Sequence, residues 1–157
     1  HRVDRRQRQM CIRDRPSIYT AALMEHNAHP DYKYDLENAT HEHEGINPSC
    51  GDELVLKLRL GDDGRTIEEA AFTGHGCAVS QASADMMADL ITGESVDEAR
   101  RLCELFIGMV QGKELSDQDR EDLDEAAELE ITSRMPARVK CAELAWRTLE
   151  GMLAEQV

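Results

Sequence analysis

The chain is short and strongly acidic, and both properties limit what it can be. It has 157 residues, a formal net charge of −14 and only 4% aromatic residues, so we expect one domain with a core of Leu, Ile, Val, Met and Ala. An acidic surface repels phosphate, which argues against nucleic acid and anionic membranes as partners. No apolar run approaches the roughly 20 residues of a membrane-spanning helix. The acidity serves either solubility or docking of a basic protein.

The first fifteen residues differ from the rest in charge. Residues 1–15 contain six arginines and two aspartates, show no apolar period and include Cys11, to which we give no role. We interpret them as a non-native or disordered tail, with a basic interaction arm as the alternative, and residues 16–157 as a single domain. Five widely spaced cysteines and no apolar signal segment predict reduced thiols or metal ligands in a cytoplasmic protein.

A helix and an edge strand are predicted first. Ser17 can cap a helix whose first turns run over 18–24 and which ends before Pro30. Residues 31–38 are predicted to form an ordered loop. We expect a short edge strand over 39–44, closed by Gly45.

The clearest period in the chain follows. Leucines alternate with other residues over 54–60, which indicates a strand with one buried face. Gly-Asp-Asp-Gly at 61–64 is a turn sequence, and a weaker strand pattern covers 66–72. Because the connection is short, the two strands should pair antiparallel.

The second half of the chain is predicted to be helical. One helix follows Cys77, and a second is capped by Ser95. The acidic stretch 114–130 predicts a loop and a short helix, and Pro136 suits the first turn of a last helix. Together these elements predict an α+β domain, in which a small antiparallel β-sheet has helices packed on one face.

Three cysteines and one aspartate lie in unusual local sequences. Cys50 and Asp52 occur in Asn-Pro-Ser-Cys-Gly-Asp, Cys77 ends Gly-His-Gly-Cys, and Cys141 ends Pro-Ala-Arg-Val-Lys-Cys. Three thiolates and one carboxylate satisfy the tetrahedral preference of zinc, although iron accepts the same atoms. The sequence therefore predicts a metal site assembled from three distant segments, which meet at one end of the domain.

The surroundings of two of these cysteines favour the thiolate. Cys77 is predicted at a helix start, where free backbone N–H groups and the helix dipole stabilise negative charge. Arg138 lies three residues before Cys141 on the same helical face, and a nearby guanidinium also favours a thiolate.

Other cysteines and histidines receive weaker interpretations. Cys103 lies on an apolar helical stripe and is expected in the core. His41 and His43 alternate with glutamates and suggest a solvated edge. His75 is a candidate either for a residue that contacts a metal ligand without binding the metal or for an alternative ligand. It ranks below Asp52 as a ligand. The His-x-Glu and Pro-Cys-x-x-Cys pattern of zinc deaminases is missing.

The three cysteine motifs together resemble the SufU-type proteins of iron–sulfur cluster assembly, over about residues 17–151. The related IscU-type scaffolds share the three cysteines and the aspartate. This chain departs from those scaffolds in a longer segment between Cys77 and Cys141 and in Lys140, where the scaffolds place a histidine. Both departures are typical of the SufU branch.

The resemblance implies a function. It implies zinc bound by Cys50, Asp52, Cys77 and Cys141, with an iron–sulfur cluster as the alternative cofactor. It also implies a pyridoxal-phosphate cysteine desulfurase of the SufS type as partner, with Cys50 accepting its persulfide sulfur when a partner histidine replaces that thiolate on zinc. Arg138 matches an arginine implicated in the partner reaction. Downstream iron–sulfur assembly proteins are expected partners. A non-catalytic cluster scaffold and a purely structural zinc module are the alternative functions.

Overall fold

The computed structural model describes residues 19–154. The predictions for residues 1–15 and for Ser17 as a helix cap fall on residues outside this range. In chain order the elements are α2 (Ala21–Ala28), β1 (His41–Asn47), β2 (Asp52–Leu60), β3 (Ile67–His75), α3 (Ala78–Ile91), α4 (Val96–Val110), α5 (Asp117–Leu123), the 3-10 helix η1 (Asp124–Arg134) and α6 (Pro136–Ala154).

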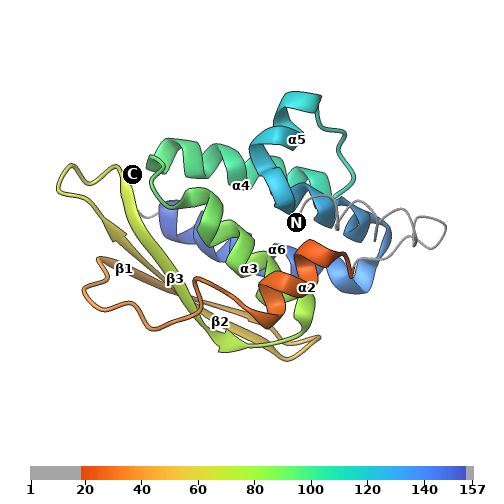
Figure 1. The fold of residues 1–157 in the computed structure, drawn as a ribbon, viewed down its shortest axis with the longest axis horizontal. Helices are drawn as coiled ribbons and strands as arrows, with labels where there is room; N and C mark the ends of the chain where they lie inside the picture. The colour runs from red at the N-terminus through yellow and green to blue at the C-terminus, as the bar shows by residue number, and fades with distance from the viewer. Residues whose placement is uncertain (1–18, 155–157) are drawn as a thin grey trace.

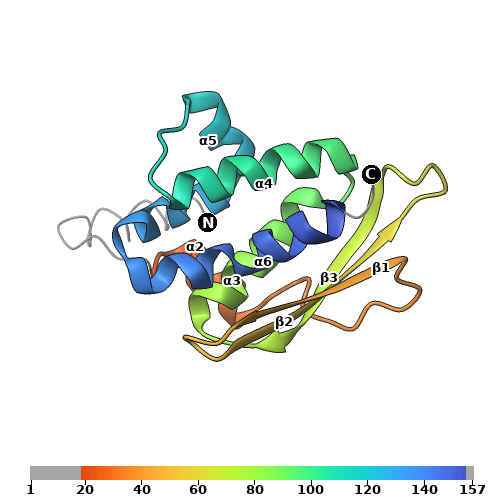
Figure 2. The ribbon, with the colours of Figure 1, turned by 180° about the vertical axis from the view of Figure 1, so that it is seen from behind.

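The molecule is layered, with a sheet on one side and helices on the other (Figure 1). The strands lie in the order β1-β2-β3, and both neighbouring pairs are antiparallel. Helix α3 packs on β3, while α6 packs on β1 and β2. Helix α4 lies against α6 on the side away from the sheet, as the reverse view also shows (Figure 2). The predicted α+β fold with helices on one face is confirmed.

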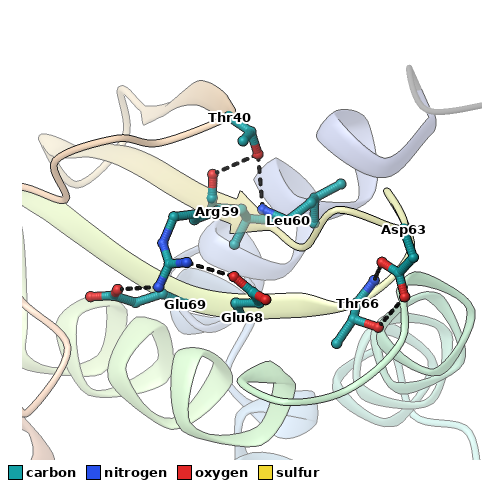
Figure 3. Close-up of polar contacts among 8 residues, drawn as sticks. Thr40, Arg59, Leu60, Asp63, Thr66, Glu68 and Glu69 are labelled. Carbon is teal, nitrogen blue, oxygen red and sulfur yellow. Dashed lines mark hydrogen bonds and ion pairs between the residues drawn. The ribbon is translucent and has the colours of Figure 1, made fainter.

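The strand period explains which residues reach the helices. Along β2, Asp52 and the four leucines at even positions are buried, while the residues between them are more exposed. Asp52 is thus the first inward residue of the leucine alternation. The face of the sheet away from the helices carries ion pairs instead, among them Arg59 with Glu68 and Glu69 (Figure 3).

Helix α3 and helix α6 form the centre of the core. Trp146 of α6 is fully buried and stacks on Phe106 of α4 with ring centroids 4.2 Å apart. The Trp146 indole Nε1–H donates to Ser83 Oγ over 3.0 Å, and Ser83 Oγ–H donates to the Ala142 carbonyl over 2.6 Å. These bonds satisfy the polar atoms that burial of this region would otherwise leave unpaired. They fix α6, and with it Cys141, against α3.

The start of α2 differs from the prediction. The helix begins at Ala21, and Thr20, with extended backbone, is its N-cap. The Thr20 hydroxyl accepts a hydrogen bond from the Leu23 amide over 3.2 Å. A helix that includes residues 19 and 20 was therefore wrong, because Thr20, a hydroxyl residue nearer the apolar positions, takes the capping role.

Two strands run further than predicted. Strand β1 passes through Gly45 and ends at Asn47, and β3 continues to His75. Gly45 does not close β1, because α6 crosses it: a Cβ there would lie 2.1 Å from Thr148 Oγ1. Gly74 is likewise a strand residue, whose missing Cβ allows the Glu53 carbonyl of β2 to approach. Glycine in these strands marks close packing and not a strand end.

The helical half agrees well with the prediction. Cys77 is the N-cap of α3, the Ser95 hydroxyl accepts from the Glu98 amide at the start of α4, and Pro136 is the first residue of α6. The acidic segment forms α5 and η1, which is more helix than the predicted loop and short helix. Among residues 19–154 no helix is both long and apolar enough to cross a membrane.

Candidate metal centre

Cys50 lies on the tight connection between the first two strands. Asn47, the last residue of β1, pairs with Asp52, the first residue of β2, so Cys50 belongs to a short hairpin loop. The Cys50 amide donates to the Asn47 carbonyl over 3.3 Å, and Gly51 takes the left-handed φ of +69° that this turn requires. The Cys50 side chain is exposed. The loop therefore presents a thiol at the surface beside a buried carboxylate.

Asp52 is fully buried and accepts three hydrogen bonds from three parts of the chain. Its Oδ1 accepts from the Cys77 amide at 2.9 Å and from Ser80 Oγ at 3.2 Å. Its Oδ2 accepts from Asn47 Nδ2 at 3.1 Å. All three donors are neutral, and within residues 19–154 the carboxylate has no ion pair with a lysine, arginine or histidine. A buried carboxylate without a cation is costly, so this environment suits a bound metal ion.

The sulfur of Cys141 lies next to both of these groups. Cys141 is buried in the second turn of α6, and its Sγ is 3.2 Å from the Sγ of Cys50. The ligand atoms of Cys50, Asp52 and Cys141 all lie within 4.8 Å of one another. Zinc bonds of about 2.3 Å place two sulfurs roughly 3.8 Å apart in a tetrahedron. The exposed Cys50 loop therefore needs to open by only about 0.6 Å to bring the two sulfurs from 3.2 Å to that separation.

Cys77 borders this group. Its amide is bonded to Asp52, and its side chain is partly buried and makes no capping bond to α3. Burial raises the pKa of the Cys141 thiol well above its ordinary value, and Cys50, Cys77 and Asp52 raise it further. A bound cation reverses this effect, since a coordinating thiol is deprotonated outright. The residues present therefore fit zinc, with Cys77 as the fourth ligand to be tested.

Arg138 stands at the edge of the site on α6. Tyr19, and after it Cys77 and Cys141, raise the pKa of the Arg138 guanidinium, so this cation lies close enough to two of the thiols to interact with them. Arginine does not bind zinc, but it attracts a thiolate or another sulfur anion. The predicted neighbourhood of Arg138 and Cys141 is therefore present in the fold.

The other cysteine and histidines lie apart from the metal centre. Cys103 is a core residue, as predicted: it is 1% exposed, and burial raises the pKa of its thiol. His75 is exposed and lies 3.3 Å from Glu53 Oε2 through its Nε2. His41 Nδ1 bonds to the hydroxyl of Thr40, and His43 approaches Gly151.

Sequence reasoning missed two polar residues of the site, Asn47 and Ser80. Both are buried and both hold the Asp52 carboxylate. Ser80 could have been found from its place one turn after Cys77 in α3. Asn47 could have been found by extending β1 beyond Gly45, which sets it opposite Asp52 in the hairpin.

Known proteins resemble this chain over most of its length. A family model described as "NifU-like N terminal domain" matches residues 18–155. The zinc-dependent sulfurtransferase SufU of Bacillus subtilis is 37% identical, over 89% of this chain and 92% of that protein. The iron–sulfur cluster assembly scaffold protein IscU of Thermotoga maritima is also 37% identical, over 87% of this chain and 92% of its own length.

A solved structure resembles the fold described above. A crystal structure from Fervidobacterium islandicum AW-1, titled a putative iron–sulfur cluster assembly scaffold protein for the SUF system, gives a TM-score of 0.76. It is 34% identical, and the match covers 87% of this chain and 96% of that one. Family model, relatives and structure agree, and we conclude that the chain belongs to the NifU-like N-terminal domain family, within its SufU and IscU group of iron–sulfur cluster assembly proteins.

Proposed function

We propose that this protein transfers sulfur in iron–sulfur cluster assembly, with zinc held by Cys50, Asp52, Cys77 and Cys141. The observation that carries the proposal is the contrast in exposure within the ligand group. Cys50 is exposed on a hairpin loop, whereas Asp52 and Cys141 are buried. A metal site that serves structure alone has no need for one accessible sulfur. The relative named a zinc-dependent sulfurtransferase supports the same function.

The proposed donor is the persulfide of a cysteine desulfurase that uses pyridoxal phosphate. The Cys50 thiolate attacks the terminal sulfur of the partner's persulfide. A new S–S bond forms on Cys50, the S–S bond in the partner breaks, and the partner's cysteine leaves as a thiolate. One thiolate replaces another, so no oxidant, reductant or net proton is needed. Zinc, when bound, supplies the chemistry that keeps these thiols deprotonated at neutral pH.

The residues around Cys50 have separate roles in this proposal. Asp52 and Cys141 stay anchored, because they belong to β2 and α6, while the Gly51 turn allows Cys50 to swing outward. Arg138 attracts the anionic sulfur of the partner. We place this chemistry in the cytoplasm, where thiols stay reduced; Cys50, Cys77, Cys103 and Cys141 are all free in the structure. Downstream iron–sulfur assembly proteins would receive the sulfur.

The test combines the zinc-loaded protein with a purified SufS-type desulfurase and cysteine. Mass spectrometry of peptides should find one added sulfur atom on Cys50. Cys50→Ala should abolish stimulation of the desulfurase, and Arg138→Ala should reduce turnover with unchanged zinc content. Cys103→Ala is the matched control, since that thiol is in the core and should leave stimulation intact. Sulfur found on Cys77 or Cys141, with Cys50→Ala still active, would overturn the mechanism.

A cluster scaffold on the same residues is the second candidate. It is favoured by the relatives of equal identity that are named IscU, and by thiolate and carboxylate ligands that accept iron as well as zinc. Elemental analysis of protein purified without added metal separates the two. One zinc per chain supports sulfur transfer, whereas stoichiometric iron with little zinc supports the scaffold.

A further inference from the structure

Asn47 joins two of the candidate ligands through one side-chain amide. Its Nδ2 donates to Asp52 Oδ2 over 3.1 Å and lies 3.6 Å from the Sγ of Cys141. An amide nitrogen carries two hydrogens and can serve both acceptors at once. The two acceptors come from β2 and from α6, elements far apart in the chain. Asn47 is therefore the one side chain on the described part of the molecule that hydrogen-bonds to both of these ligands.

The fold leaves this amide few alternatives. Asn47 is only 4% exposed, so water does not compete for its hydrogens. The pairing of β1 with β2 places it directly opposite Asp52, and both side chains point toward the helices. A buried amide whose partners are removed would be left unsatisfied, which destabilises the folded state. The amide, the carboxylate and the thiol therefore hold one another in place.

The two oxygens of Asp52 are engaged differently. Oδ1 accepts two hydrogen bonds, from the Cys77 amide and from Ser80, and these occupy its two lone pairs. From residues 19–154, Oδ2 accepts only the bond from Asn47, which leaves one of its lone pairs for a metal beside the sulfurs of Cys50 and Cys141. The geometry points to Asn47 as the positioning residue of the metal centre: it aims the free lone pair of Asp52 Oδ2 at the metal and restrains Cys141 beside it, which makes Asp52 a one-oxygen ligand and slows metal release.

This inference rests on the proposed function only in that the site binds a metal, and does not depend on sulfur transfer. Removing a group that orients a ligand typically costs about 10–100-fold in metal affinity. Zinc-loaded Asn47→Ala should therefore pass its zinc to a chromogenic chelator about 10–100-fold faster than the wild type. The cobalt-substituted variant should show altered d–d and thiolate-to-metal absorption bands, which a loss of general stability would leave unchanged.

Two further variants act as controls. Ser83→Ala removes an equally buried hydrogen-bonding side chain that joins α3 to α6 without contacting a ligand. It should lower the melting temperature but keep zinc release within about twofold of wild type. Ser80→Ala should have an effect smaller than Asn47→Ala, because the Cys77 amide still holds Oδ1.

The outcomes separate this inference from the function proposed above. A wild-type chain that binds no metal overturns both the proposed function and this inference, whereas a chain that binds metal but takes no sulfur on Cys50 overturns the proposed function alone. Wild-type release rate and cobalt spectrum in Asn47→Ala would overturn the positioning role alone. Should that variant not fold, the wild-type protein decides by NMR. The Asn47 side-chain amide resonances should be protected from exchange with water and should shift when chelator removes zinc; identical resonances in both forms would overturn the inference.

Discussion

The two hairpin turns of the sheet each carry an aspartate that accepts three hydrogen bonds, yet the two aspartates serve different purposes. At the β2–β3 turn, Asp63 accepts from the Arg65 amide at 2.9 Å. It also accepts from the Thr66 amide at 3.0 Å and from the Thr66 hydroxyl at 2.8 Å (Figure 3). At the β1–β2 turn, the donors to Asp52 come from β1, from the cap of α3 and from α3 itself. Local donors stabilise a turn, whereas donors from distant segments hold the carboxylate of a proposed ligand.

Exposure separates the two carboxylates further. Asp63 is exposed, and its hydrogen bonds to Arg65 and Thr66 lower the pKa of its carboxyl, so it is an anion stabilised by its own turn. Asp52 is fully buried and lacks a positive partner within the described residues. Three hydrogen bonds alone therefore do not make an aspartate a candidate ligand; burial and the missing cation do.

We expect the largest effect when the first of these two aspartates, Asp52, is replaced by alanine. Asp52→Ala should weaken zinc binding by about 100-fold or more, since a direct ligand matters at least as much as a group that orients one. With zinc in excess, each 100-fold loss of zinc affinity should lower the free energy of unfolding of the variant by about 2.7 kcal/mol. The loss is partial, because three thiolates remain and water can take the fourth position.

Asp63→Ala is the matched variant and should lower the melting temperature slightly without changing zinc content. Chelator competition and thermal melting, with and without zinc, measure both effects. Equal zinc affinity in Asp52→Ala and wild type would remove Asp52 from the ligand set and end the contrast between the turns.

A second pair of substitutions probes the space around the buried aspartate. A Cβ on Gly76 would lie 2.5 Å from Asp52 Oδ1 and 2.6 Å from Ser80 Oγ, so Gly76→Ala should displace the carboxylate and weaken zinc binding by about 10-fold. Gly64→Ala in the other turn strains a backbone with φ of +67° but meets no atom within 4 Å. It should cost about 1 kcal/mol of folding stability and leave zinc titrations unchanged. Unaltered zinc binding in Gly76→Ala would contradict the tight packing around Asp52.

A third carboxylate, Asp85, shows the consequence of supplying a cation. Asp85 is 1% exposed, and its Oδ2 lies 2.6 Å from His26 Nδ1. The hydrogen bond to Asp85 is the main cause that raises the pKa of His26 from 6.5 to about 9, with Glu125 adding to it and burial opposing it. The folded state thus binds the proton more tightly than the unfolded state, and the resulting stabilisation is complete below pH 6.5.

That stabilisation should be lost as the pH rises through about 9, by about 1–3 kcal/mol. Chemical denaturation of wild type and His26→Gln between pH 6 and 10 should give free energies of unfolding that converge at high pH. His29→Gln, which changes an exposed histidine at the end of α2, is the control and should parallel wild type throughout. A constant difference in the free energy of unfolding between wild type and His26→Gln across this range would show that the proton on His26 does not contribute to stability.

The smallest effect is expected from the arginine-rich start of the chain, which opposes the charge of the rest. A chain beginning at Pro16 should keep its melting temperature within about a degree, and its zinc content and desulfurase stimulation unchanged. We propose this because residues 1–15 lack an apolar period and include none of the four proposed ligands. Loss of any of these properties on truncation would make the tail a working part of the protein.

Most of the fold could be predicted from the sequence because its signals are local. The leucine period of β2, the Ser95 cap of α4 and Pro136 at the start of α6 each depend on residues a few positions apart. The errors arose where distant packing decides. Gly45 ends a strand by local rules but continues one here, because α6 needs a residue without a side chain at the crossing.

The sequence predicts candidate ligands but not the residues that support them. Sulfur and carboxylate make Cys50, Asp52, Cys77 and Cys141 candidates by chemistry alone, and the structure brings Cys50, Asp52 and Cys141 together. Asn47 has no such chemistry: it is a common turn residue, and only the pairing of β1 with β2 places it opposite Asp52. The same strand-end error that shortened β1 therefore concealed the role of Asn47.

The position of Cys141 in the last helix also has a consequence for protein synthesis. Cys50, Asp52 and Cys77 leave the ribosome early, but α3, α4, α5 and η1 must all be made before Cys141 follows in α6. Until then the inner face of β1, which α6 covers, has no cover either. The proposed metal centre can therefore be completed only after nearly all of the domain has been translated, and we expect metal loading to follow folding of the last helix instead of nucleating the sheet.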